Sequence, residues 1–267
     1  MKKRPFLVLV LSLVLAMPGC QSAPEPVDAT LPAAPSPVVV SPVPGSARPA
    51  TPTFQMLGSV TLSQSGKSPD FSTKVTRPVR NGSDNPHAVA FNKYISALVE
   101  KQVDGFKKSL LELTPVAFAP ESSFQIKYTL VSETANFISL QLKMDQYTSG
   151  AAHPFQSSMS VNYDLAHDRQ IELGELFTTG SNYLQTIANY SKDTLSKTDL
   201  GPALFTDGLA PTADNYRNWN ISAEGLMITF DEYQVAPYAA GPQIVVVPYD
   251  LLKSMIAPQG ALADYAH

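Results

Sequence analysis

Side chains that could do chemistry gather first in a short segment near the middle of the chain. It opens at Tyr147, passes through a small-residue loop at Gly150, and reaches the pair His153-Pro154. Histidine can ligate metals or move protons near neutral pH, and the small residues before it would let a ligand or another backbone come close. The alternative, which we favour, is that His153 hydrogen bonds its own loop and fixes the direction of the chain.

A metal site at His153 would need two or three further ligands. The other histidines, His87, His167 and His267, are expected at a helix start, in a turn and on the C-terminal tail. None of them lies at ligand spacing from His153, and a single cysteine is a poor metal site. We therefore expect no metal and no cofactor.

A second group of such residues lies in the loop from Asp231 to Gly241. It holds two adjacent carboxylates and two tyrosines around a proline: Asp231, Glu232, Tyr233, Tyr238 and Pro237. Carboxylates beside aromatic rings could perform acid–base chemistry or bind a sugar whose ring stacks on tyrosine. Because neighbouring side chains on an extended chain point to opposite faces, the two carboxylates are not expected to form a catalytic pair. The alternative is that the tyrosines are half-buried supports that stiffen a crossover between strands.

Familiar catalytic motifs do not occur in the sequence. There is no G-x-S-x-G elbow, no H-E-x-x-H pair and no dinucleotide glycine fingerprint. Gly66-Lys67-Ser68 is similar to the end of a phosphate-binding loop, but Thr61 occupies the place of its first glycine and no strand is expected before it. The sequence favours a non-catalytic protein. The rival is a cell-envelope hydrolase that uses His153 with Asp231 or Glu232.

The N-terminus predicts export and a lipid anchor. A cationic start, Met1–Arg4, precedes an apolar run from Pro5 to Met17 that is too short to span a membrane. The Gly19-Cys20 pair that follows resembles the bacterial lipoprotein signal, in which the cysteine is lipidated after cleavage. Since Cys20 is the only cysteine, it cannot form an intramolecular disulfide. We expect an extracytoplasmic protein that is held to the membrane through Cys20.

Residues 20–53 predict an extended tether. Nine of the 23 prolines fall there, so the segment favours polyproline II and could reach on the order of 100 Å at ~3.1 Å per residue. Val38–Val40 is the single hint of order, and the flanking prolines argue against a strand. The net charge of −4 becomes −7 once the three basic residues of Met1–Arg4 are removed, which excludes nucleic acid as a partner for want of a basic surface.

The chemistry-bearing residues must be positioned by strands and helices, which hydrophobic periodicity predicts. The longest helix is expected to start at the N-cap Asn85, with Pro86 in its first position, and to end at Thr114-Pro115. The other expected strands are 71–79, 124–130, 138–144, 159–165, 219–221, 226–230 and 243–248, and the other helices are 171–177, 182–196 and 249–256. This order predicts an α+β fold, a two-part antiparallel sheet with helices packed on one face, preceded by the Pro-rich tether.

Two segments resemble a known family. Gly150–Pro154 with its following strand, and Phe230–Pro242 leading to Val247–Tyr249, are similar to the bacterial extracytoplasmic DUF3298 family. That domain forms the C-terminal part of the extracellular region of lysozyme-sensing anti-sigma factors of the sigma-V type. A smaller DUF4163 domain commonly precedes it and also occurs before peptidoglycan deacetylase domains. Residues from about 55 to 145 resemble this partner through their order of strand, helix and hairpin. Ala151 departs from the family, which usually has a second glycine there.

The expected organisation follows from these observations. It comprises a lipoprotein signal peptide at 1–19, a Pro-rich linker at 20–53, a DUF4163-like domain at 54–148, a DUF3298-like domain at 149–258 and a tail at 259–267. The resemblance implies a secreted fold used for recognition. We expect a non-catalytic binding or sensor module for a wall glycan such as peptidoglycan, a lysozyme-like lytic enzyme or another envelope protein. A purely structural or assembly role in the envelope is a further alternative.

Overall fold

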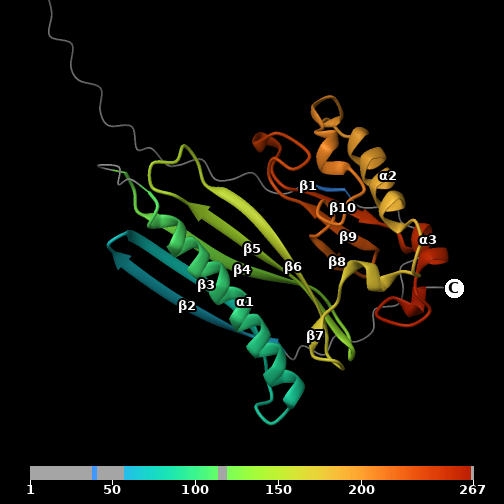
Figure 1. Cartoon of the computed structure of the whole chain (residues 1–267), viewed down its shortest axis with the longest axis horizontal. Helices are drawn as coiled ribbons and strands as arrows, with labels where there is room; N and C mark the ends of the chain where they lie inside the picture. The colour runs from blue at the N-terminus through green and yellow to red at the C-terminus, as the bar shows by residue number, and fades with distance from the viewer. Residues whose placement is uncertain (1–37, 41–56, 114–118, 266–267) are drawn as a thin grey trace, which may run out of the picture. The chain divides into compact units, whose positions relative to one another are not determined.

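The computed structural model describes residues 38–40, 57–113 and 119–265 of the 267-residue chain, and residues 38–40 through their backbone alone. Cys20, His267 and most of the predicted tether lie outside the described residues, so lipidation and the linker stay predictions. The α+β class is confirmed: two sheets are each covered by helices (Figure 1). None of the helices in the described part is both long and apolar enough to cross a membrane.

The larger sheet has six strands in chain order. They are β2 (Leu57–Lys67), β3 (Asp70–Arg80), β4 (Ser122–Glu133), β5 (Phe137–Tyr147), β6 (Phe155–Asp164) and β7 (Arg169–Gln170). All neighbouring pairs are antiparallel except β3 and β4, which run parallel. The parallel pair departs from the all-antiparallel expectation, because the helix between these strands acts as a crossover that returns the chain to the same end of the sheet.

That crossover is α1 (Pro86–Leu110), and its start is the one predicted. The Asn85 side chain accepts hydrogen bonds from the backbone N–H groups of His87 and Ala88, and Pro86 occupies the first turn. The buried face of α1 packs on β3 and β4, where Phe106 stacks on Phe124 at 5.1 Å. This contact joins the helix to alternate apolar residues of the strands and leaves the other face of the sheet to polar side chains.

β2 is the longest of the described strands that the sequence did not predict. Its residues are small or polar and mostly exposed, so the strand has no apolar alternation. The expectation that no strand precedes Gly66-Lys67-Ser68 is therefore wrong. Lys67 ends β2 opposite Asp70, and their side chains form an ion pair at 3.0 Å. The lysine thus belongs to an exposed hairpin end and not to a phosphate-binding loop.

The smaller sheet has the order β1-β10-β9-β8. Its strands are β8 (Trp219–Ile221), β9 (Leu226–Phe230), β10 (Gln243–Val247) and β1 (Val38–Val40), which pairs in parallel with β10. The three valines are therefore extended strand, contrary to the expectation drawn from their flanking prolines. α2 (Tyr183–Ser196) and α3 (Tyr249–Leu252) pack against this sheet around a second hydrophobic core, and residues 173–176 form a 3-10 helix.

A buried polar layer, here called the polar seam, joins the two sheets. It consists of Ser139, Gln141, Ser160, Asn162, Asn220 and Thr229. The Asn162 amide donates to the Trp219 carbonyl at 2.7 Å, and the Ser139 hydroxyl accepts from the Ile221 N–H at 3.0 Å. Side chains of β5 and β6 thereby satisfy the edge of β8, as buried backbone groups require. Because β6 also pairs with β5 along its length, sheet pairing crosses the predicted boundary at residues 148 and 149.

Candidate functional site

The two segments singled out from the sequence meet in the folded chain. His153 precedes β6, and the loop after β9 brings Asp231, Glu232, Tyr233 and Tyr238 against it. We call these five residues the aromatic–carboxylate cluster. About 80 residues separate its two halves in the sequence, and the six-stranded and smaller sheets each supply one of them.

His153 is held by the backbone beside it and by Tyr238. Its Nδ1 lies 2.9 Å from the Pro154 carbonyl, which also accepts a hydrogen bond from the Tyr238 hydroxyl at 3.3 Å. The neutral ring therefore carries its proton on Nδ1 and keeps Nε2 as an acceptor. The rings of His153 and Tyr238 stack with centroids 4.0 Å apart. The interpretation in which His153 bonds its own loop is thus confirmed.

Tyr233 extends this stack toward solvent. Its ring lies 5.7 Å from that of Tyr238 at an interplanar angle of 29°, and its hydroxyl is 3.5 Å from Nε2 of His153. The side chain is 50% exposed, and its backbone has the unusual φ of 64°. A non-glycine residue with positive φ is uncommon, and such strain concentrates at functional sites. Tyr233 is therefore an exposed ring at the end of a stack and not a half-buried support.

Asp231 caps the edge of β6. One carboxylate oxygen accepts from the Ser158 N–H at 2.8 Å, and the other accepts from the Asn218 amide at 3.1 Å and faces Arg217 at 3.6 Å. Burial raises the pKa of Asp231, while the Ser158 N–H, Arg217 and Asn218 act in the opposite direction. Both oxygens are occupied, so Asp231 is a structural anchor between the sheets.

Glu232 makes the same kind of contact with one oxygen and leaves the other without a partner. Oε2 accepts from the Gln156 N–H at 2.9 Å, whereas Oε1 is buried and has no hydrogen bond within the described structure. The side chain is 4% exposed, and burial raises its pKa, with Asp145 raising it further and Gln156 and His153 lowering it. The two adjacent carboxylates reach the same strand, because the turn at Tyr233 replaces the extended chain that was expected.

The remaining predicted residues lie around this cluster. Tyr147 is buried at the end of β5, opposite Ser123, and Gly150 has a φ of 85° in the following loop. Pro237 is exposed at the start of the 3-10 turn that presents Tyr238. The sequence did not point to Phe155, which is 43% exposed next to His153-Pro154. An exposed aromatic residue directly after a predicted ligand loop was the signal that could have found it.

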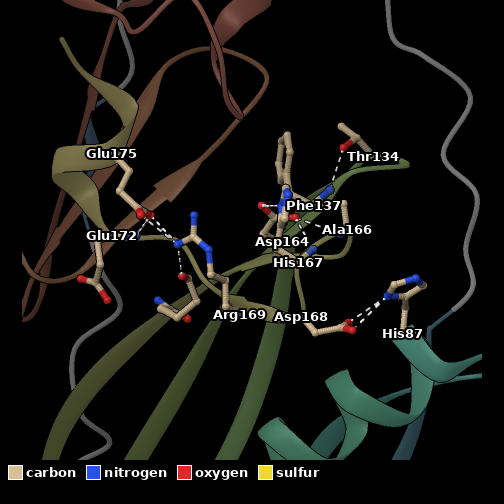
Figure 2. A network of polar contacts seen from close by, with 11 residues as sticks. His87, Thr134, Phe137, Asp164, Ala166, His167, Asp168, Arg169, Glu172 and Glu175 are labelled. Atoms are coloured by element: carbon tan, nitrogen blue, oxygen red, sulfur yellow. Dashed lines mark hydrogen bonds and ion pairs between the residues drawn. The ribbon is translucent and has the colours of Figure 1, made fainter.

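Two further histidines form separate pairs with aspartates near the β6–β7 turn (Figure 2). His87, at the start of α1, lies 3.1 Å from Asp168, and His167 lies 2.8 Å from Asp164. His87 and Asp168 are 81 residues apart in the sequence, so their contact could not be predicted from spacing. It joins the start of α1 to the β6–β7 turn. Among residues 57–113 and 119–265, no group of three or more histidine, cysteine, aspartate or glutamate side chains could hold a metal ion.

The cluster is built for contact more than for proton transfer. Its carboxylates are buried or hydrogen bonded to the backbone of β6, while its aromatic rings reach the surface. The Tyr238 hydroxyl keeps its proton at neutral pH, because burial, Glu232 and Tyr233 raise its pKa. The site therefore offers a stacked aromatic surface with hydroxyl and imidazole groups at its rim. Such surfaces bind flat rings and the apolar faces of sugars.

The fold is that of solved DUF3298 proteins. A crystal structure of a family member from Bacteroides fragilis covers 79% of this chain and 95% of its own with a TM-score of 0.60 at 16% identity. A second, from Pseudomonas aeruginosa, covers 76% of this chain and 94% of its own with a TM-score of 0.50 at 15% identity. The family model described as "Protein of unknown function (DUF3298)" matches residues 174–250. The DUF3298 part of the predicted resemblance is thereby supported.

Particular relatives are more distant in sequence. Over 168 residues the chain is 24% identical to the Bacillus subtilis protein named peptidoglycan-N-acetylmuramic acid deacetylase PdaC, covering 62% of this chain and 36% of the relative. It is 27% identical over 114 residues to the immunogenic proteins MPB64 of Mycobacterium bovis and MPT64 of Mycobacterium tuberculosis, covering 41% of this chain and 48% of each. The chain thus matches between a third and a half of the length of these relatives.

Proposed function

We propose that this protein is a non-catalytic, extracytoplasmic module that binds cell-wall glycan through the aromatic–carboxylate cluster. The supporting observation is the surface stack of His153, Tyr238 and Tyr233, whose outer ring is held exposed by a strained backbone. A ring that is exposed and fixed in position beside two others offers a surface on which a sugar can stack. The name of PdaC places that relative on peptidoglycan, which agrees with a glycan ligand.

The hydrolase alternative has less support from the geometry. Its residues are close together, since Glu232 and Asp231 accept hydrogen bonds from the N–H groups of Gln156 and Ser158, which closely follow His153 in the chain. However, a general acid must reach the group that it protonates, and the unpartnered oxygen of Glu232 is buried. Asp231 has no oxygen free to act as a base or nucleophile.

Titration calorimetry with N-acetylglucosamine oligosaccharides and muropeptides tests the binding function. Tyr238→Ala removes the middle ring of the stack, so the affinity is expected to fall about tenfold, the equivalent of roughly 1.4 kcal/mol. Phe205→Ala, which removes an exposed aromatic ring outside the cluster, is the matched control and is expected to bind as the parent does.

Two results would overturn the proposal. One is the absence of binding to any wall fragment by the parent protein. The other is turnover of a wall fragment that is lost in His153→Ala, which would establish the hydrolase instead. Binding to a lysozyme-like enzyme or an envelope protein, with no binding to glycan, would reassign the ligand to a protein partner.

The position of this module in the cell is the second part of the proposal. We propose that Cys20 carries a lipid and that the Pro-rich segment after it holds the binding module away from the membrane. The support is the signal-like sequence that ends in Gly19-Cys20. Cys20→Ala is expected to move the protein from the detergent phase to the aqueous phase in phase partitioning. Unchanged partitioning would refute lipidation.

A further inference from the structure

The face of the six-stranded sheet opposite α1 is polar across its width. In β3 and β4 the apolar residues that pack under α1, such as Val75 and Ile126, alternate with residues that point the other way. Those alternate positions hold serine, threonine, glutamine and lysine: Ser72, Lys74, Ser123, Gln125, Lys127 and Thr129.

Half of this polar face is closed and half is open. Over β6 and the Ser139–Gln141 part of β5 the smaller sheet covers it, as the 2.7 Å hydrogen bond from Gln141 to Thr229 shows, whereas Lys143, two residues further along β5, is partly exposed. Over β2, β3 and β4 a shallow hollow remains, lined by polar side chains that include Ser63, Ser72, Ser123 and Gln125. None of the five residues of the aromatic–carboxylate cluster lines this hollow.

Three lysines lie together on the open half, on three adjacent strands. Lys127 of β4 stands directly opposite Lys143 of β5, and Lys74 of β3 stands opposite Gln125, two residues from Lys127. Among the described residues, no hydrogen bond or ion pair involves any of these three ammonium groups. Like charges directly opposite each other on neighbouring strands destabilise a sheet. One acid, Asp145, lies on the same face, two residues from Lys143 and opposite Gln125, and its carboxylate accepts a hydrogen bond from Gln156 at 2.7 Å.

Such a cationic cluster is unexpected in a chain of net charge −4. Repulsion between Lys127 and Lys143 would be relieved by an anion that bridges them. We propose that the open half of this face binds the acidic groups of a polysaccharide, with the lysines holding carboxylate or phosphate and the hydroxyl and amide groups holding sugar hydroxyls. This site is independent of the aromatic–carboxylate cluster, so either can exist without the other.

The surrounding side chains select a polysaccharide over other polyanions. Single-stranded nucleic acid binds through aromatic rings on which its bases stack, and the open half presents serines, threonines and glutamines in their place. A membrane surface attracts clusters of four to eight basic residues, which exceeds the three lysines here. Hydroxyl and amide side chains instead match the many donors and acceptors of a sugar chain.

The test is binding of the full-length chain, purified in detergent, to polygalacturonate, to a phosphomannan and to neutral dextran. Binding to one or both acidic polymers and not to dextran is expected, with affinity that falls as salt is raised. The polymer that binds more tightly identifies carboxylate or phosphate as the preferred group. The double variant Lys127→Gln/Lys143→Gln is expected to bind about tenfold more weakly, because two surface charge contacts are lost.

A control with the same charge change isolates the site. Lys192→Gln/Lys253→Gln neutralises two exposed lysines that lie elsewhere and is expected to bind within about twofold of the parent. The Lys127/Lys143 variant is also expected to unfold at the same or a higher temperature, since it removes a like-charge pair. If the double variant does not fold, Lys127→Gln alone provides the comparison.

Several outcomes would overturn the site. They are no binding of either acidic polymer, an equal loss in the control variant, equally tight binding of duplex DNA, or equally tight binding of phosphatidylglycerol vesicles by Cys20→Ala, which lacks the proposed lipid anchor. Tyr238→Ala is expected to leave acidic-polymer binding unchanged. The two proposals are therefore tested separately: Lys127→Gln/Lys143→Gln reports on acidic-polymer binding, and Tyr238→Ala reports on wall-glycan binding.

Discussion

The polar seam makes one stability prediction that can be worked out from its contacts. The Ser139 hydroxyl is fully buried, donates to Oδ1 of Asn162 at 2.6 Å, and accepts from the Asn220 amide and the Ile221 N–H, each at 3.0 Å. Ser139→Ala removes one oxygen with little change of shape. It leaves the Ile221 N–H and the Asn162 oxygen without partners, while the Asn220 amide keeps its bond to the Leu140 carbonyl.

The expected loss follows from the two groups that are stranded. A buried polar group without a partner costs about 1–3 kcal/mol, so the two stranded groups should lower the free energy of unfolding of Ser139→Ala by about 2–6 kcal/mol. Ser160→Ala is the matched control, since Ser160 lies on the same face of the sheet and makes a single bond, to Asn220 at 2.9 Å. With Ser160 9% exposed and water able to replace its hydroxyl, we expect a loss of about 1 kcal/mol there.

Urea denaturation of both variants, followed by circular dichroism, measures the two losses directly. The midpoint should fall further for Ser139→Ala, with the slope of the transition unchanged. Equal losses of unfolding free energy in the two variants would refute the reasoning. They would show that the three hydrogen bonds of Ser139 stabilise the fold no more than the single hydrogen bond of Ser160. A changed slope would mean that the two sheets no longer unfold together.

The remaining predictions concern Glu232 and the start of α1. Burial raises the pKa of Glu232 above its ordinary 4.5. Just above that pH the folded state therefore binds more protons than the unfolded state, so proton binding at Glu232 favours folding at low pH, and the folded protein loses stability as the pH rises. Glu232→Gln should therefore gain stability relative to the parent between pH 4 and pH 8, measured by thermal melts; a constant difference would contradict it. Asn85→Ala removes the cap that serves His87 and Ala88 and should cost about 1 kcal/mol in the same melts, whereas Asn85→Asp should cost less.

Most of the fold could be predicted from local patterns, and the exceptions have physical causes. α1 was predictable at its start because Asn85 and Pro86 are strong local signals, and β4 and β5 alternate cleanly. β2 was missed because both of its faces are exposed, which removes the alternation that marks a half-buried strand. β3 and β4 were expected to be antiparallel but are parallel. The order of the elements does not show whether the helix between two strands brings the chain back to the same end of the sheet.

The residues of the candidate site could be predicted from the sequence, but their contacts with one another could not. His153, Glu232 and Tyr238 could be selected from their types, but their contacts join positions about 80 residues apart. Asp231 has two side-chain partners, Arg217 and Asn218. Both precede a short strand, in a segment without hydrophobic periodicity or a motif that would mark them. The positive φ of Tyr233 is a property of the folded turn, in which both carboxylates contact β6 instead of pointing to opposite faces.

The joint between the sheets explains why the carboxylates look catalytic in the sequence and act as structure in the fold. β8 is the last strand of the smaller sheet, and β6 pairs with β7 only at Tyr163 and Asp164, so both strands have unpaired backbone groups where the sheets meet. Such an edge must be satisfied by other groups. Ser139 and Asn162 do this for β8, and Asp231 and Glu232 do it for β6. A backbone N–H group binds a carboxylate more strongly than a neutral oxygen, so acids are suitable caps at a joint with few other contacts. Once these acids are fixed to β6, the loop that carries them must place Tyr233 and Tyr238 beside His153. The aromatic surface is therefore as rigid as the joint itself, and a ligand that stacks on it meets rings that are already in position.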